Sequence, residues 1–313
     1  MRFFTSMEMY LRSCALVAGL LFSVCSAHAQ ELEPRAYSNL PVGLNFAVMA
    51  YAYSEGGLAT DPSLPIDDAH LRIHTGAFAY ARSLDLMGSS GRFELIMPFS
   101  VLSGTALVAG APASREISGL GDPRFRLAVN FRGAPAGDLK AYAKYMAQPP
   151  RTVVGASLQV IPPLGQYDPS KLINLGTNRW AFKPDIGFSR RIKSFTWDMT
   201  LGAALMTENT NFYGGKHVEQ DPIYSTQLNV SYDFGKGLWV ALGTTYYTGG
   251  RTTVDGVEKD NELGNSRVGL TVALPINRHY SLKLNVSTGI STRTGTSFDT
   301  YGLALQYRWG GGL

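Results

Sequence analysis

Apolar and polar side chains alternate one by one along most of the chain from residue 42 onward. Phe93, Leu95 and Met97, for example, are separated from one another by single residues of other types. Side chains on a β-strand point to opposite faces in turn, so this pattern predicts strands with one apolar face and one polar face. We expect twelve such strands, near residues 42–51, 70–80, 92–101, 124–132, 154–160, 179–189, 195–202, 224–234, 238–247, 267–274, 282–290 and 300–309.

The lengths of the connections favour one of two architectures that use such strands. A soluble all-β protein buries the apolar faces, whereas an outer-membrane barrel turns them toward lipid. The connections after odd-numbered strands are mostly long, as in 54–67, 103–119 and 208–221, and those after even-numbered strands are mostly short. The connections 133–150 and 292–299 break this rule. Long loops at one end and tight turns at the other predict an all-β fold, a transmembrane outer-membrane antiparallel β-barrel of about 12 strands over residues 42–309.

The first residues have the pattern of a targeting segment. Arg2 and Arg12 precede the apolar stretch 13–24, and Ala27-His28-Ala29 offers a cleavage site with small residues at both flanks. This predicts a signal peptide over residues 1–29, cleaved near Ala29, rather than an anchor helix, for which the apolar stretch is short. A short periplasmic N-terminal segment over residues 30–41 would then precede the barrel, and residues 310–313 would form a C-terminal tail.

The composition excludes several classes of protein and of site. The chain has 313 residues, 17% of them charged, and a mean hydropathy of −0.03, which is too polar for a bundle of membrane-spanning helices. Both cysteines, Cys14 and Cys25, lie within the predicted signal peptide. The mature chain would therefore have neither thiol catalysis nor cysteine metal sites.

Several short motifs carry a family resemblance. They are Gly119-Leu120-Gly121-Asp122-Pro123, the loop from Pro163 to Pro169, and the stretch from Asn174 to Pro184. Together they resemble the outer-membrane β-barrel family of the MetA-pathway of phenol degradation type. The resemblance implies a channel or transporter, often associated with catabolism of aromatic compounds. It also implies a barrel-insertion machinery that recognises the C-terminal strand, here ending at Trp309 before the glycine tail.

Charges on the predicted lumen faces suggest what such a channel would carry. Cations outnumber anions there, and a wall of one sign attracts counter-ions. We therefore expect passive uptake of small polar or anionic solutes, with aromatic catabolic substrates a further option. The expected partners are this small-molecule solute, outer-membrane lipid and lipopolysaccharide. The candidate channel-lining residues are Arg72, His74, Arg124, Arg126, Arg179, Lys183, Asp198, Arg267 and Arg308.

Two other functions remain open at this point. Glycines at predicted lumen positions, among them Gly155 and Gly187, indicate open space, but a structural barrel with a filled lumen stays an alternative. An outer-membrane hydrolase is the minor alternative, because His217 lies in a polar loop with Asp221 nearby. No HExxH or GxSxG motif accompanies the histidines, so no catalytic, cofactor-binding or metal residue is predicted. Nucleic acid is not expected as a partner, because the basic residues are spread singly along the strands.

Overall fold

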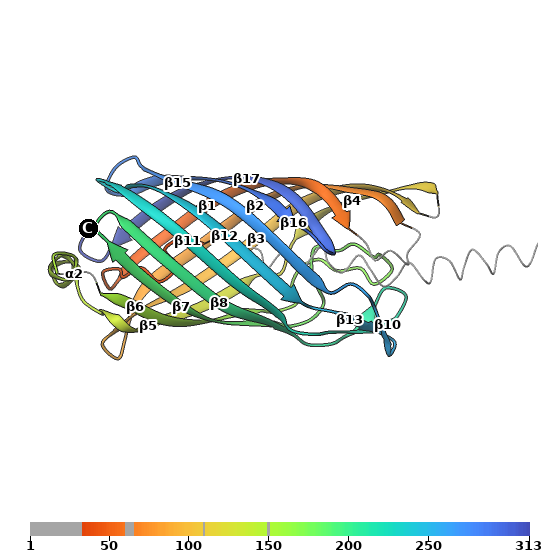
Figure 1. The fold of residues 1–313 in the computed structure, drawn as a ribbon, viewed down its shortest axis with the longest axis horizontal. Coiled ribbons are helices and arrows are strands. Elements are labelled where there is room, and N and C mark those ends of the chain that lie inside the picture. The colour runs from red at the N-terminus through yellow and green to blue at the C-terminus, as the bar shows by residue number, and fades with distance from the viewer. Residues whose placement is uncertain (1–32, 60–65, 109, 149–150) are drawn as a thin grey trace, which may run out of the picture.

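A computed structural model describes residues 33–59, 66–108, 110–148 and 151–313, and the predicted signal peptide lies outside these residues. Strands form a long barrel that encloses a lumen (Figure 1). The elements are β1 (Leu44–Ala59), β2 (Ile66–Leu86), β3 (Ser89–Val108), β4 (Ala111–Leu120), β5 (Arg124–Pro135), α2 (Leu139–Met146), β6 (Thr152–Ile161), β7 (Ala181–Ile192), β8 (Phe195–Met206), β9 (Asn209–Phe212), β10 (Lys216–Gln220), β11 (Ile223–Gly235), β12 (Leu238–Gly249), β13 (Thr252–Val254), β14 (Val257–Glu258), β15 (Leu263–Pro275), β16 (Tyr280–Ser291) and β17 (Gly295–Gly310).

The sheet closes on itself through antiparallel pairs. Each barrel strand pairs with its neighbours in the chain, β1 pairs with β17, and β2 pairs with β3 to complete the ring. β4 and β5 both pair with β3 and are two halves of one strand, interrupted at Gly121–Pro123. The result is the predicted antiparallel barrel of twelve strands. Closure satisfies backbone groups that lipid could not.

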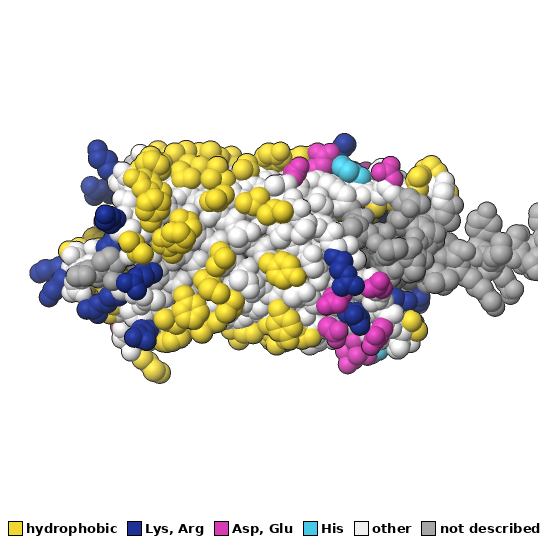
Figure 2. All heavy atoms as spheres, viewed as in Figure 1, with side chains coloured by type: hydrophobic (Ala, Val, Ile, Leu, Met, Phe, Trp, Pro, Cys, Tyr) yellow, Lys and Arg dark blue, Asp and Glu magenta, His cyan; other side chains and the backbone are white. Residues whose placement is uncertain are grey.

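The outer surface carries a broad apolar band. Figure 2 shows hydrophobic side chains over the wall, with charged side chains concentrated toward the two ends. Large outward side chains include Leu127, Leu158, Trp197 and Leu242, which are exposed and belong to the faces predicted to contact lipid. The predicted orientation is thus confirmed for these strands.

The first two strands have the opposite orientation to the predicted one. In β2, Phe78 is exposed and Leu71 is buried, so the even-numbered positions face outward. In β1, Met49 faces outward opposite Phe78, and Phe46 faces the lumen. Both faces of these strands carry apolar residues, so the apolar set alone does not identify the lipid-facing side. One apolar set is buried inside the barrel, and the other faces lipid.

Two of the predicted long loops are largely strand. Residues 54–59 and 66–67 extend β1 and β2, and residues 103–120 form the β3–β4 hairpin apart from its tip. Backbone pairing between neighbouring strands continues through these residues. The tight turn at the other end of β2 uses Met87 and Gly88, whose φ values of 55° and 82° suit a two-residue hairpin turn.

The long connection 133–150 contains the short helix α2. Asp138 is its N-cap, and its carboxylate accepts a hydrogen bond from the Ala141 backbone. The helix lies beyond the end of the wall that carries the short turns (Figure 1). Within the described residues, no helix is both long and apolar enough to cross a membrane.

The end opposite α2 is covered by folded connections. A small sheet of β9, β10, β13 and β14 buries Phe212, Val218 and Val254. The connection 162–180 folds inward, and its Ile173 packs with Leu71 and neighbouring apolar side chains inside the barrel. Buried side chains of this cluster therefore occupy part of this end of the lumen.

Asp122, at the interruption between β4 and β5, holds that inward connection in place. Its carboxylate is buried and accepts hydrogen bonds from the Gly165 backbone and from both the backbone and the hydroxyl of Thr177, each 2.8 Å long. These bonds connect the motif at residues 119–123 with the stretch 174–184. The two motifs that carried the family resemblance thus meet in space.

We predict that Asp122→Ala lowers the free energy of unfolding by about 2–4 kcal/mol, because three donors lose a charged acceptor. Guanidinium unfolding in detergent micelles measures the change. Glu116→Gln, an exposed change on neighbouring β4, is the control and should leave the midpoint unchanged. An Asp122→Ala midpoint equal to that of the wild type would contradict the assigned role.

Candidate functional site

A cavity of about 1160 Å³ occupies the half of the lumen nearest α2. Its wall is strongly charged. Nine cationic residues line it, namely Arg35, Arg92, Arg124, Arg126, Lys183, Lys236, Arg278, Lys283 and Arg308. Four carboxylates accompany them, namely Glu33, Glu94, Asp185 and Asp233. The cavity is therefore net cationic.

One side of the same cavity is apolar. It is formed where β1, β2 and β3 run side by side, of which β1 and β2 are the two strands whose predicted orientation was reversed. The lining side chains there include Phe46, Val48, Ala79, Ala81 and Ile96. The cavity thus combines a cationic wall with an apolar strip.

Residues 33–43, here called the lumen segment, lie inside the barrel. The sequence predicts a short periplasmic segment over residues 30–41, and the described part of that stretch contributes to the lining of the cavity. The Glu33 carboxylate lies between two wall arginines, 2.5 Å from Nη1 of Arg126 and 3.2 Å from Nη2 of Arg92. Both arginines also contact Glu94. The first described residue of the segment is therefore held by a network of four charges.

Tyr37 anchors the middle of the lumen segment. Its ring is buried against Gly155 and Gly187, which pair across β6 and β7. A Cβ atom at Gly187 would lie 1.9 Å from the ring, so only glycine leaves room for it. The Tyr37 hydroxyl lies 3.3 Å from Oγ of Ser157. The lumen glycines that suggested open space instead form a slot for this tyrosine.

Arg35 makes a third set of contacts. Its backbone N–H donates to the Asp198 carboxylate at 3.2 Å, and its guanidinium lies 3.7 Å from Asp233. The guanidinium also lies 5.3 Å from the ring centre of Trp239, within the range of a cation–π contact. The lumen segment thus contacts β3, β5, β6, β7, β8, β11 and β12.

The charge state of Glu33 follows from these neighbours. Burial raises the pKa of the Glu33 carboxyl, but the attraction of Arg126 and Arg92 outweighs burial and lowers the pKa from 4.5 to about 2. The carboxylate is therefore ionised at neutral pH, and its attachment to the wall is ionic.

Four predicted lining residues lie in the cavity wall. They are Arg124, Arg126, Lys183 and Arg308. Asp198 and Arg267 also face inward but are buried in contacts: Asp198 holds the Arg35 backbone, and Arg267 donates to Ser287 and to the Phe298 carbonyl.

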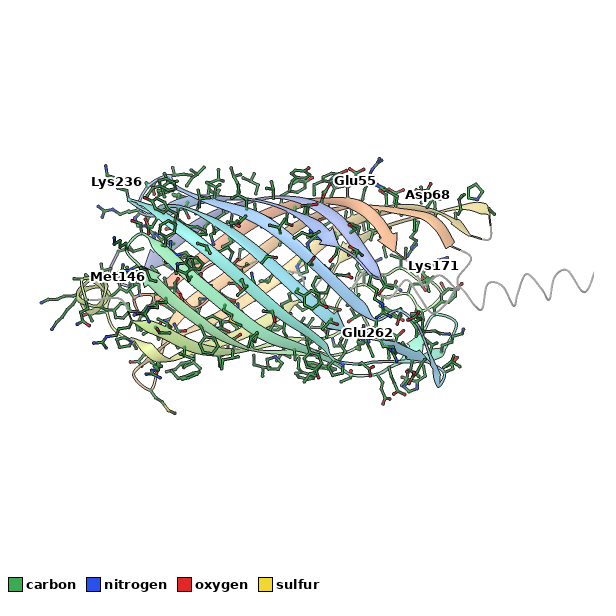
Figure 3. The ribbon with its side chains drawn as sticks, viewed as in Figure 1. Glu55, Asp68, Met146, Lys171, Lys236 and Glu262 are labelled. Atoms are coloured by element: carbon green, nitrogen blue, oxygen red, sulfur yellow. The ribbon has the colours of Figure 1, made fainter. Side chains whose placement is uncertain are left out.

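Three predicted lining residues lie elsewhere. Arg179 is buried in the connection before β7, where it contacts Gln220. Arg72 and His74 lie on the outer face, so their prediction as channel-lining residues was wrong. Arg72 is 60% exposed and pairs with Glu55 across β1 and β2 near the end opposite α2, where Figure 3 shows Glu55.

Sequence reasoning missed the contribution of the lumen segment. Glu33, Arg35 and Tyr37 lie in a short irregular stretch with no periodicity to place them. The only available signal was the pair of lumen glycines, Gly155 and Gly187, whose register reveals a slot only once β6 and β7 are paired.

His217 has carboxylate neighbours, though not the predicted Asp221. Its Nε2 lies 3.0 Å from Glu208 and its Nδ1 lies 3.8 Å from Glu219, all at the surface of the small sheet. These three residues are close enough to hold a metal ion, and none of them lines the cavity. They add nothing to the chemistry of the lumen.

Comparison with known proteins agrees with the fold. Residues 52–307 match the family described as the MetA-pathway of phenol degradation. An outer membrane channel from Pseudomonas putida F1 is similar in structure, with a TM-score of 0.75, 20% sequence identity, and coverage of 89% of this chain and 100% of that one. The transport unit of the autotransporter AIDA-I from Escherichia coli reaches a TM-score of 0.51 at 8% identity, covering 90% and 94% of the two chains. No curated protein sequence matches.

The Tyr37 slot can be tested directly. We predict that Tyr37→Ala raises single-channel conductance in planar bilayers, because the lumen segment loses about 3 kcal/mol or more of aromatic packing. Tyr142→Ala on α2, which lines the same cavity without touching the slot, is the matched control. Equal conductance in Tyr37→Ala and the wild type would show that the segment does not limit conduction.

Acid should release the segment only at low pH. Because the pKa of Glu33 lies below its ordinary value of 4.5, the ionic attachment is complete above that value and is lost as the pH falls toward 2. We expect wild-type conductance to stay constant from about pH 8 to about pH 5, while Glu33→Gln conducts more throughout this range. Conductance recorded over this pH series tests the attachment, and an increase already beginning near pH 6 would speak against it.

Proposed function

This chain belongs to the MetA-pathway of phenol degradation family and is an outer-membrane β-barrel, and from this premise we propose that it is a passive channel for small polar or anionic solutes. The observation that carries the proposal is the net cationic wall of the lumen cavity, nine cations against four carboxylates. In a narrow lumen with low-dielectric walls, such an excess concentrates anions and repels cations.

The apolar strip of the cavity favours anionic solutes that also carry an apolar part. Phe46, Val48 and Ile96 lie in the same cavity as Arg124 and Lys183. An aromatic carboxylate could place its ring on the strip and its charge near the cations. Aromatic carboxylates from catabolism are therefore the solutes that we propose for transport.

A structural barrel with a filled lumen is the second candidate. The lumen segment lies in the α2 half beside the cavity, and the cluster around Ile173 lies toward the opposite end. In this function the charges around Glu33 would serve only to hold the segment. Conduction by the purified protein separates the two candidates, since a filled barrel would be silent.

We predict that the wild-type reversal potential in a KCl gradient has the sign of an anion-preferring channel. The double variant Lys183→Glu, Arg308→Glu should shift it toward cation preference, because two cavity cations become anions. The double variant Lys171→Glu, Lys216→Glu, which makes the same charge change in the connections at the opposite end, should shift it much less. Cation preference in the wild type would refute the proposal.

Solute preference can be measured by liposome swelling. Benzoate should enter faster than benzylamine of similar size, with benzyl alcohol between them, because the cavity is cationic and partly apolar. Equal rates for the three solutes would leave passive conduction intact but would contradict selectivity for aromatic anions.

A further inference from the structure

Arginines lie on the outer face of the barrel where the apolar band ends near α2. On β7 the outward side chains include Phe182, Ile186 and Phe188. Arg190 has the next outward side chain toward the turn after β7. On β5 the exposed Phe131 is followed by the exposed Arg132. Figure 2 shows Lys and Arg side chains gathered at this end, whereas acidic side chains accompany them at the opposite end.

Arg132 and Arg190 flank a single strand. Arg132 is opposite Val154 and Arg190 is opposite Thr152, so both lie beside the outward positions at the start of β6. Their backbones are two strand spacings apart across the sheet and two residues apart along it, about 12 Å in all, which two extended arginine side chains can bridge. In the part of the chain that the structure describes, neither forms a salt bridge, and Arg190 donates only to the Thr152 hydroxyl, at 3.4 Å.

An aromatic side chain completes the surface. Trp197 on β8 is opposite Arg190 and is 54% exposed. Beside it in the same belt, Phe195 and Tyr232 form an edge contact, with ring centres 4.9 Å apart. Exposed tryptophan and tyrosine at the edge of an apolar band are typical of the membrane–water interface. We call Arg132, Thr152, Arg190 and Trp197 the arginine patch.

We propose that the arginine patch binds the phosphate headgroup of an anionic phospholipid in the periplasmic leaflet. The short turns lie at this end of the barrel, which is the periplasmic end in outer-membrane barrels, and the leaflet there consists of phospholipid. Guanidinium groups bind phosphate oxygens through paired N–H donors, and Trp197 lies where the glycerol and upper acyl chain would pass. Unlike Arg72, which pairs with Glu55 at the other end, these arginines keep their charge available to a ligand.

Lipid retention by the purified full-length barrel tests the proposal. Native mass spectrometry with phosphatidylglycerol, phosphatidylcholine and lipid A as probes should show preferential retention of phosphatidylglycerol. The variant Arg132→Gln, Arg190→Gln should bind phosphatidylglycerol about 30-fold more weakly, since each interfacial arginine contributes roughly fivefold. Quenching of Trp197 by brominated phosphatidylglycerol should fall in parallel, with Trp197→Phe identifying its share of the signal.

Lys140→Gln, Lys144→Gln is the matched control. It removes two exposed charges at the same end, but from α2 rather than from the lipid-facing wall, and should keep wild-type retention. Gel mobility with and without heating confirms that each variant forms a folded barrel. Equal retention of phosphatidylcholine and phosphatidylglycerol, equal loss in the control, or preferential retention of lipid A would each overturn the proposal.

Discussion

Every strand of a closed membrane barrel faces lipid on one side and the lumen on the other, and this constraint determines most of the structure. The outer face must be apolar over the thickness of the lipid, and the backbone must be paired throughout because lipid offers no partners. With twelve strands the lumen is narrow, and side chains together with folded-in segments fill much of it. The inward face is therefore partly a protein core and partly a wetted wall, which explains why Leu71 and Arg126 both point inward.

This mixture of apolar core and polar wall on the inward face limits how much of the fold the sequence could predict. Alternation with period two was sufficient to place the barrel strands, because lipid contact leaves an unmixed apolar set on one face, as in β5 and β7. It did not determine which face of β1 and β2 points inward, because the inward residues of these two strands are also apolar. Nothing in the local pattern distinguishes Phe46, which lines the cavity, from Met49, which faces outward. The inward side chain of Leu71 packs with Ile173, which is more than a hundred residues away in the chain.

The candidate site was predictable to the same degree. Arg124, Arg126, Lys183 and Arg308 belong to strands with clear alternation, and all four line the cavity. The lumen segment could not be found, because the ionic contacts of Glu33 and the slot for Tyr37 are assembled from strands that are distant in sequence. The contacts of Glu33 also change the interpretation of the wall charges, because Arg92 and Arg126 hold its carboxylate and so attach the lumen segment to the wall.

A shift of one residue along a strand decides which environment an arginine side chain contacts. Arg190 and Arg191 are adjacent, so one faces outward beside Trp197 and the other turns inward and donates to the Met146 carbonyl of α2. Arg132 shows the same principle through an irregularity. In a regular strand it would share the inward face of Arg126, but the register shift between Val129 and Arg132 turns it outward. Composition alone would count all these arginines toward lumen charge, whereas the bulge and the pleat divide them between the lumen, the helix and the outer face.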